Sequence, residues 1–66
     1  MILGNITRLC KEKGISIAKL ERETDISNGT ISKWGVRSPT VENARKVAEF
    51  FGVTLDELVR DTGGEG

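Results

Sequence analysis

The sequence predicts an all-α fold, a compact domain of five short helices, and three observations support this. Apolar residues recur at the three-to-four residue spacing of amphipathic helices in separate segments. Serine or threonine precedes most of these segments and glycine follows two of them, as helix caps do. A chain of 66 residues has room for only one core. We therefore expect one domain over residues 1–60 and a flexible tail or linker over residues 61–66.

The first predicted helix ends near Lys13. Ile6, Leu9 and Cys10 are spaced as one apolar helix face, and Gly14 follows as the C-cap. Because Ile6, four residues earlier, is apolar, we expect Cys10 to be a small core residue rather than a reactive thiol.

The second predicted helix runs from Ile17 to Thr24 after an N-cap at Ser16. Leu20 is its chief inward residue. Its four charged residues, Lys19, Glu21, Arg22 and Glu23, are expected to stay solvated. We interpret the two glutamates as ordinary helix-surface charges.

A third helix is predicted over residues 27–34, with Ser27 as its N-cap. The pair Asn28-Gly29 is a hairpin signal elsewhere, but the flanking residues lack strand alternation. Turning about 100° per residue places Ile31 and Trp34 on an apolar side. The opposite side has no carboxylate and gathers Asn28, Gly29, Ser32 and Lys33.

The last two helices follow a loop over residues 35–39, which Gly35 and Pro39 indicate. Thr40 is expected to cap the fourth helix, which stops at Gly52. Residues 54–57 then match the capping box, in which a threonine and a glutamate satisfy each other's amides. The fifth helix is expected to end near Arg60.

The composition excludes several classes of function. Cys10 is the single cysteine and there is no histidine, which rules out an internal disulfide, a zinc finger and Cys/His or Ser/His catalytic pairs. No uncharged stretch is long enough to cross a bilayer, and no export signal is visible. We expect a cytoplasmic protein that is not an enzyme and takes no cofactor or metal.

The charge is zero overall but unevenly distributed. Residues 26–46 carry four basic and one acidic side chain, a net charge of +3, whereas residues 47–66 carry a net charge of −4. A basic middle next to a carboxylate-free helix face is typical of a surface that meets the phosphates of DNA.

This charge pattern and the two helices around residues 17–34 predict binding of double-stranded DNA through the major groove. Candidate base-reading residues are Asn28, which can pair with adenine, Lys33, which can donate to guanine, Ser32, and Gly29, which permits close approach. The free amides at helix starts and nearby polar side chains are the candidate phosphate contacts, namely Ser16, Ser27, Arg37, Ser38, Thr40 and Asn43.

Several segments closely resemble the phage repressor and Cro-type helix-turn-helix family. They are K-E-K-G-I-S, L-E-R-E, S-N-G-T-I-S-K-W, S-P-T-V-E-N and F-F-G-V-T-L-D-E-L, spread over residues 6–59. The short connection over residues 34–39 is similar to repressors from phages and mobile elements of Gram-positive bacteria. By position, Asn28, Gly29 and Lys33 match base-reading residues of the family, and Ser27 and Asn43 match common phosphate contacts.

The resemblance implies a lambda-repressor-like fold, homodimeric operator binding and transcriptional control. It also implies dimer contacts around Leu55, Leu58 and Val59. From the residues alone, all three could instead belong to the core. The chain departs from the family at Ile17, where glutamine is frequent, at Glu21, where alanine is usual, and at Asp25, where the turn usually has glycine.

Two alternatives remain open. The fold is compatible with a protein-interaction module that has lost DNA reading. The glycine-rich end is also compatible with the DNA-binding head of a longer repressor.

Overall fold

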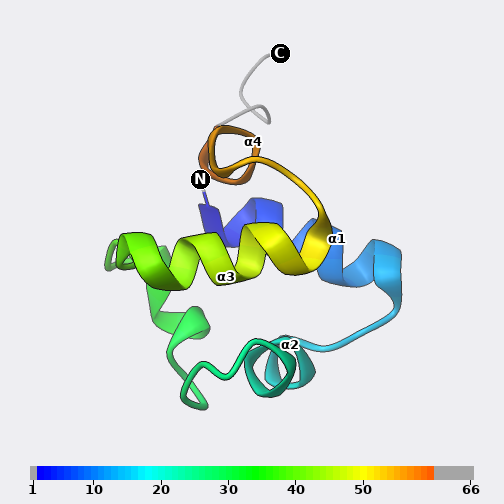
Figure 1. Cartoon of the computed structure of the whole chain (residues 1–66). Coiled ribbons are helices and arrows are strands. Elements are labelled where there is room, and N and C mark those ends of the chain that lie inside the picture. The colour runs from blue at the N-terminus through cyan, green and yellow to red at the C-terminus, as the bar shows by residue number, and fades with distance from the viewer. Residues whose placement is uncertain (1, 61–66) are drawn as a thin grey trace.

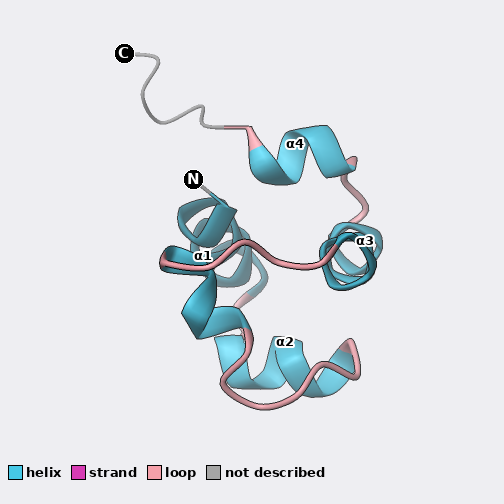
Figure 2. Cartoon of the chain, turned by 90° about the vertical axis from the view of Figure 1, so that its left-hand side faces the viewer, coloured by secondary structure: helices cyan, strands magenta, loops and turns pink. Residues whose placement is uncertain are grey.

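The computed structural model describes residues 2–60 and is all-helical in that part of the chain (Figure 1). Helix α4 lies at one end and helix α2 at the other, with α1 and α3 between them (Figures 1 and 2). The predicted tail, residues 61–66, lies outside the described residues. No described helix is long and apolar enough to span a bilayer. The elements in chain order are α1 (Ile2–Lys13), α2 (Ile17–Glu23), the 3-10 helix η1 (Ile31–Gly35), α3 (Val41–Phe51) and α4 (Leu55–Val59).

The predicted third α-helix over residues 27–34 is wrong, so the described part has four α-helices and one 3-10 helix instead of five α-helices. Residues 28–30 form turns, and the amides of Lys33 and Val36 bond carbonyls three residues back, as in a 3-10 helix. Gly29 has a φ of 89°. A right-handed helix needs a negative φ, so it cannot pass through this residue.

The other helix ends follow the predicted caps. The hydroxyls of Ser16 and Thr40 accept the amides of the residues three positions on, at 3.0 and 3.1 Å. Thr54 and Glu57 bond each other's amides at 3.0 Å, which confirms the capping box. Gly52 ends α3 with a left-handed φ of 72°.

The core takes one completely buried side chain from every helical element. These are Ile6 of α1, Leu20 of α2, Ile31 of η1, Val47 of α3 and Leu58 of α4. The predicted core positions at Cys10 and Trp34 are confirmed as well. Burial raises the pKa of the Cys10 thiol. This makes the reactive thiolate scarcer at neutral pH, in keeping with a structural role.

Asn5 connects the two ends of the described chain. Its side-chain amide, in the first helix, donates to the carbonyls of Leu58 and Arg60 at 2.7 Å in each case. The last carbonyls of a helix have no donor within the helix. The Asn5 side chain therefore supplies the hydrogen-bond donors that the C-terminal end of α4 lacks. Helix α4 has only five residues and depends on such outside partners.

We expect Asn5→Ala to lower the free energy of unfolding by about 1–3 kcal/mol, because it leaves two carbonyls, one of them well buried, without a donor. Thr7→Ala is the matched control. The Thr7 hydroxyl is exposed and bonds a carbonyl of its own helix, so its removal should change stability by less than about 0.5 kcal/mol. Urea unfolding measures both. Equal effects would contradict the assigned role of Asn5.

Candidate nucleic-acid interface

Helix α2, the turn after it and η1 form two helical elements joined by a tight connection. Thr24 ends α2, and its buried hydroxyl donates to the carbonyl of Leu20 at 2.6 Å. Asp25 adopts a left-handed φ of 61°, a conformation that Asp tolerates better than most residues do. Ile26 is buried directly after it, as predicted. Asp25 therefore makes the sharp turn that the family usually makes with glycine.

The side predicted to face outward does so. Asn28, Ser32 and Lys33 are exposed and Gly29 is half-buried, while Ile31 and Trp34 are enclosed by the core. The 3-10 geometry keeps the two faces apart because residues three apart, such as Ile31 and Trp34, stack directly above each other. The exposed side of this segment carries no acidic group.

Glu21 was predicted to be a solvated surface charge, and this is wrong because only 2% of its surface is exposed. One carboxylate oxygen accepts the amide of Gly29 at 2.9 Å, and the other accepts the amide of Ile31 at 2.8 Å. Such bonds reduce the free-energy cost of burying a carboxylate, which is high when its oxygens have no donors. Glu21 therefore belongs to the scaffold of the turn and not to the wet face of α2.

A signal for this burial was present in the sequence. With Leu20 at 0° and about 100° per residue, Thr24 falls near 40°, Ile17 near 60° and Glu21 near 100°. Glu21 thus borders the inward arc of α2.

A groove of about 190 Å³ lies between η1, the following loop and the start of α3. It brings together five of the predicted site residues, from the consecutive stretch of η1, the loop and the start of α3. Its lining comprises Thr30, Lys33, Trp34, Arg37, Ser38, Pro39, Thr40 and Asn43. Two cations, several hydroxyls and an amide side chain thus surround the N-terminal end of a helix, where the helix dipole favours anions. The sequence did not single out Thr30.

The remaining predicted site residues lie outside this groove. Ser16 sits at the start of α2, where its hydroxyl caps the helix. Ser27 was predicted to cap a helix, but η1 begins later, and Ser27 instead accepts the amide of Thr30 at its backbone carbonyl, at 3.1 Å. Asn28, Gly29 and Ser32 belong to the neighbouring turn and η1 and do not line the groove.

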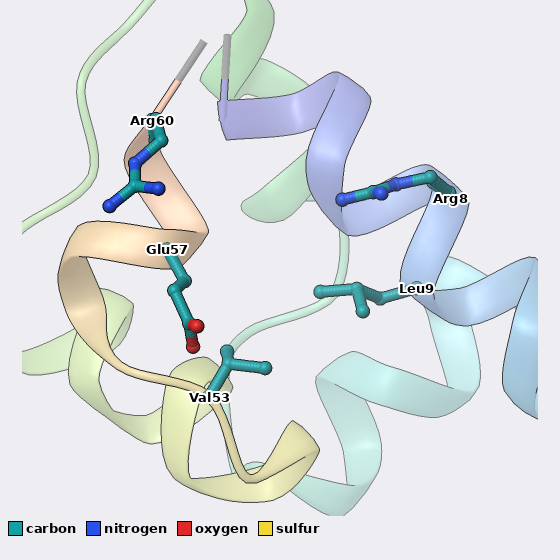
Figure 3. Close-up of a pocket in the computed structure, with 5 residues that line it drawn as sticks. All are labelled: Arg8, Leu9, Val53, Glu57 and Arg60. Atoms are coloured by element: carbon teal, nitrogen blue, oxygen red, sulfur yellow. The ribbon is translucent and has the colours of Figure 1, made fainter. Parts of the chain in front are cut away.

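Another hollow, of about 290 Å³, lies between α1 and α4. Figure 3 shows Arg8 and Leu9 projecting from α1 toward Val53 and Glu57. The Glu57 carboxylate is engaged by the Thr54 amide at the start of α4. Arg60, at the other edge, bonds Asp56, which raises the pKa of its guanidinium. These charged groups support α4, so this hollow is a weaker candidate site than the groove beside η1.

A third groove, of about 480 Å³, is mostly apolar and lies where α3 begins and α4 passes. Val41 and Val59 line it and are 67% and 49% exposed. Leu58 was expected to lie either in a dimer contact or in the core, and it is completely buried inside the domain. It is therefore a core residue that a second chain cannot reach.

Comparison with protein families decides what kind of domain this is. The helix-turn-helix family model matches residues 6–58, which covers all elements from within α1 to within α4. The chain belongs to the Xre and lambda-repressor-like helix-turn-helix family. Neither the curated proteins nor the solved structures that were compared include a match to it.

Members of this helix-turn-helix family are DNA-binding transcription regulators and are generally not enzymes. Within residues 2–60, no group of three or more acidic or cysteine side chains is placed to hold a metal ion. Within the matched residues, α2 and η1 are the two helical elements that the turn at Asp25 connects.

The conformation of Gly29 gives a test of the turn. Gly29→Ala should destabilise the domain by about 1–2 kcal/mol, because alanine is strained at a φ of 89° even though its Cβ meets no atom within 4 Å. Gly4→Ala is the control. It lies in α1 with open space around it, and alanine there should stabilise by about 0.5–1 kcal/mol. Thermal unfolding of both variants tests the turn, and a neutral Gly29→Ala would argue against the left-handed conformation.

Proposed function

We propose that this domain is a sequence-specific transcriptional repressor that inserts η1 and the preceding turn into the major groove of an operator. The observation that supports this best is the outward, carboxylate-free side of residues 28–33 lying beside a groove with two cations. Negatively charged DNA requires such a surface. An operator occupied in this way is closed to other proteins, so repression needs no further activity from the chain.

Three side chains are proposed to read bases. Asn28 can bond the ring nitrogen and amino group of adenine together, Lys33 can donate to the acceptors of guanine, and Ser32 can contact either. All three are exposed. Gly29, between them, lets the backbone come close to the base edges.

The groove beside η1 is proposed to hold the phosphate backbone. Arg37 supplies charge and paired donors, and Ser38, Thr40 and Asn43 surround the N-terminal end of α3. Ser16 and Ser27 are proposed as further phosphate contacts on either side of the turn. Such contacts set the position of the domain on the duplex, whereas base contacts set its sequence preference.

Lys33→Ala and Arg37→Ala separate these two roles. Lys33→Ala should weaken binding to a selected operator by about 1–3 kcal/mol and relax the preference at one base pair. Arg37→Ala should weaken binding to all sequences alike and lower the salt slope by about 1. Titration of DNA selected from random duplexes, at several salt concentrations, measures both.

Lys11→Ala is the control, since it removes one cation from the exposed side of α1, away from the groove. It should leave the sequence preference and the salt slope nearly unchanged. A domain that selects no DNA sequence would favour a protein-interaction module on the same fold. A domain that selects a sequence regardless of Lys33 and Arg37 would contradict the roles assigned to these two side chains.

We further propose that a second copy of the chain occupies the apolar groove between α3 and α4. That groove shares Ser38, Pro39 and Thr40 with the proposed phosphate groove, so a dimer formed there keeps both η1 elements next to the contact. Operators read by such dimers have two half-sites related by a two-fold axis. Val41, Val59 and the half-buried Leu55 offer the apolar surface.

Val59→Asp should convert the dimer to a monomer, because it places a charge in an apolar contact. Val36→Asp is the matched control. Val36 is 89% exposed and lies outside this groove, so the same change there should leave the association intact. Sedimentation equilibrium without DNA measures the mass of each variant. A wild-type chain that stays monomeric at high concentration would overturn this assignment.

A further inference from the structure

Glu21 holds both sides of the turn between α2 and η1. Its backbone carbonyl accepts the amide of Ile26 at 2.8 Å, and its carboxylate accepts the amides of Gly29 and Ile31 at 2.9 and 2.8 Å. One buried residue of α2 therefore fixes three successive points of the segment that follows. Among the described residues, Glu21 is the one whose two side-chain oxygens both accept backbone amides of residues 26–31.

The start of η1 differs from the starts of α2, α3 and α4. Those three helices are each capped by the hydroxyl of the residue directly before them. Thr30 precedes η1 but makes no side-chain cap bond, and the amide of Ile31 goes to Glu21 instead. The cap comes from ten residues earlier, so it links two elements and not only the first turn of one. The orientation of η1 against α2 is thereby tied to a single carboxylate.

The side chains proposed to read bases lie directly before and after the residues whose amides Glu21 accepts. Asn28 precedes Gly29, and Ser32 and Lys33 follow Ile31 directly. A shift of the backbone at Gly29 or Ile31 moves these side chains with it. Glu21 itself is too deeply buried to contact DNA, so any effect it has on binding must pass through the segment it holds.

From these contacts we propose that Glu21 is a positioning residue for DNA reading. Its carboxylate holds the turn and η1 in the one arrangement in which Asn28, Ser32 and Lys33 face the same base edges. The proposal rests on the proposed function, because it assigns to that site the group that sets its geometry. It also implies that the amides of Gly29 and Ile31 are taken up inside the protein, so that side chains and not these amides meet the DNA.

Glu21→Gln is the sharpest test, because it keeps the shape but turns one acceptor into a donor that faces an amide. We expect the Gly29 and Ile31 amides to exchange with solvent at least about tenfold faster, with the exchange in α1 and α3 little changed. Binding to the selected operator should weaken about tenfold, and discrimination against other sequences should fall with it. Glu23→Gln is the matched control. Glu23 lies on the same helix, is exposed and pairs with Lys19 at 3.6 Å, so its change should affect neither measurement.

Each outcome bears on one of the two claims. Faster exchange at Gly29 and Ile31 with unaltered operator preference would overturn the positioning role, while the effects of Lys33→Ala would still support the proposed function. A wild-type domain without sequence preference would overturn the proposed function, whatever the exchange rates show.

If the Glu21→Gln variant folds poorly, the contact can be tested in the wild-type domain instead. In the wild-type domain, Gly29 and Ile31 amides that exchange as fast as those of an unfolded peptide would refute the carboxylate contact directly. The substitution can also be made in the Gly4→Ala background, where added helix stability should keep the domain folded.

Discussion

The shared burial of five side chains, one from each helical element, is the constraint on which the rest of the molecule depends. The elements have between 5 and 12 residues, and isolated helices of that length are marginal in water. None of them can therefore be expected to persist without the apolar contacts made by Ile6, Leu20, Ile31, Val47 and Leu58. The surface around η1 is held in place because Ile31 and Trp34 belong to that core.

In addition to this core, buried polar side chains satisfy the backbone groups at two helix ends. Asn5 satisfies the end of α4, and Glu21 satisfies the start of η1. In both cases a buried side chain supplies, from another helix, the partner that a helix end cannot find within itself. Elements of five residues can then be placed as firmly as longer helices.

Features that depend on neighbouring residues could be predicted from the sequence, whereas features that depend on contacts between separate helices could not. The caps at Ser16, Thr40 and Thr54 and the left-handed Gly52 depend on residues a few positions apart, and the sequence shows them directly. The α-helix expected over residues 27–34 required a negative φ at Gly29. In the observed turn, the carboxylate of Glu21 in α2 accepts the amides of Gly29 and Ile31. Helical periodicity within one segment cannot predict such a partner on another helix. The burial of Leu58, which the sequence left open, likewise depends on α4 packing against α1, an element more than 40 residues away in the sequence.

If η1 enters the major groove as proposed, its short 3-10 form limits how many base pairs a single domain can read. Its five residues at a rise of about 2.0 Å span roughly 10 Å, which is close to three steps of 3.4 Å along a DNA strand, and the turn before it adds only the proposed contacts of Asn28 and Gly29. A run of three base pairs recurs by chance every few dozen positions on random DNA, far too often to mark a single address. Under the proposed function, two such short readings joined at a fixed separation mark a site far more narrowly than one reading does, and the spacing between half-sites carries information in addition to the bases.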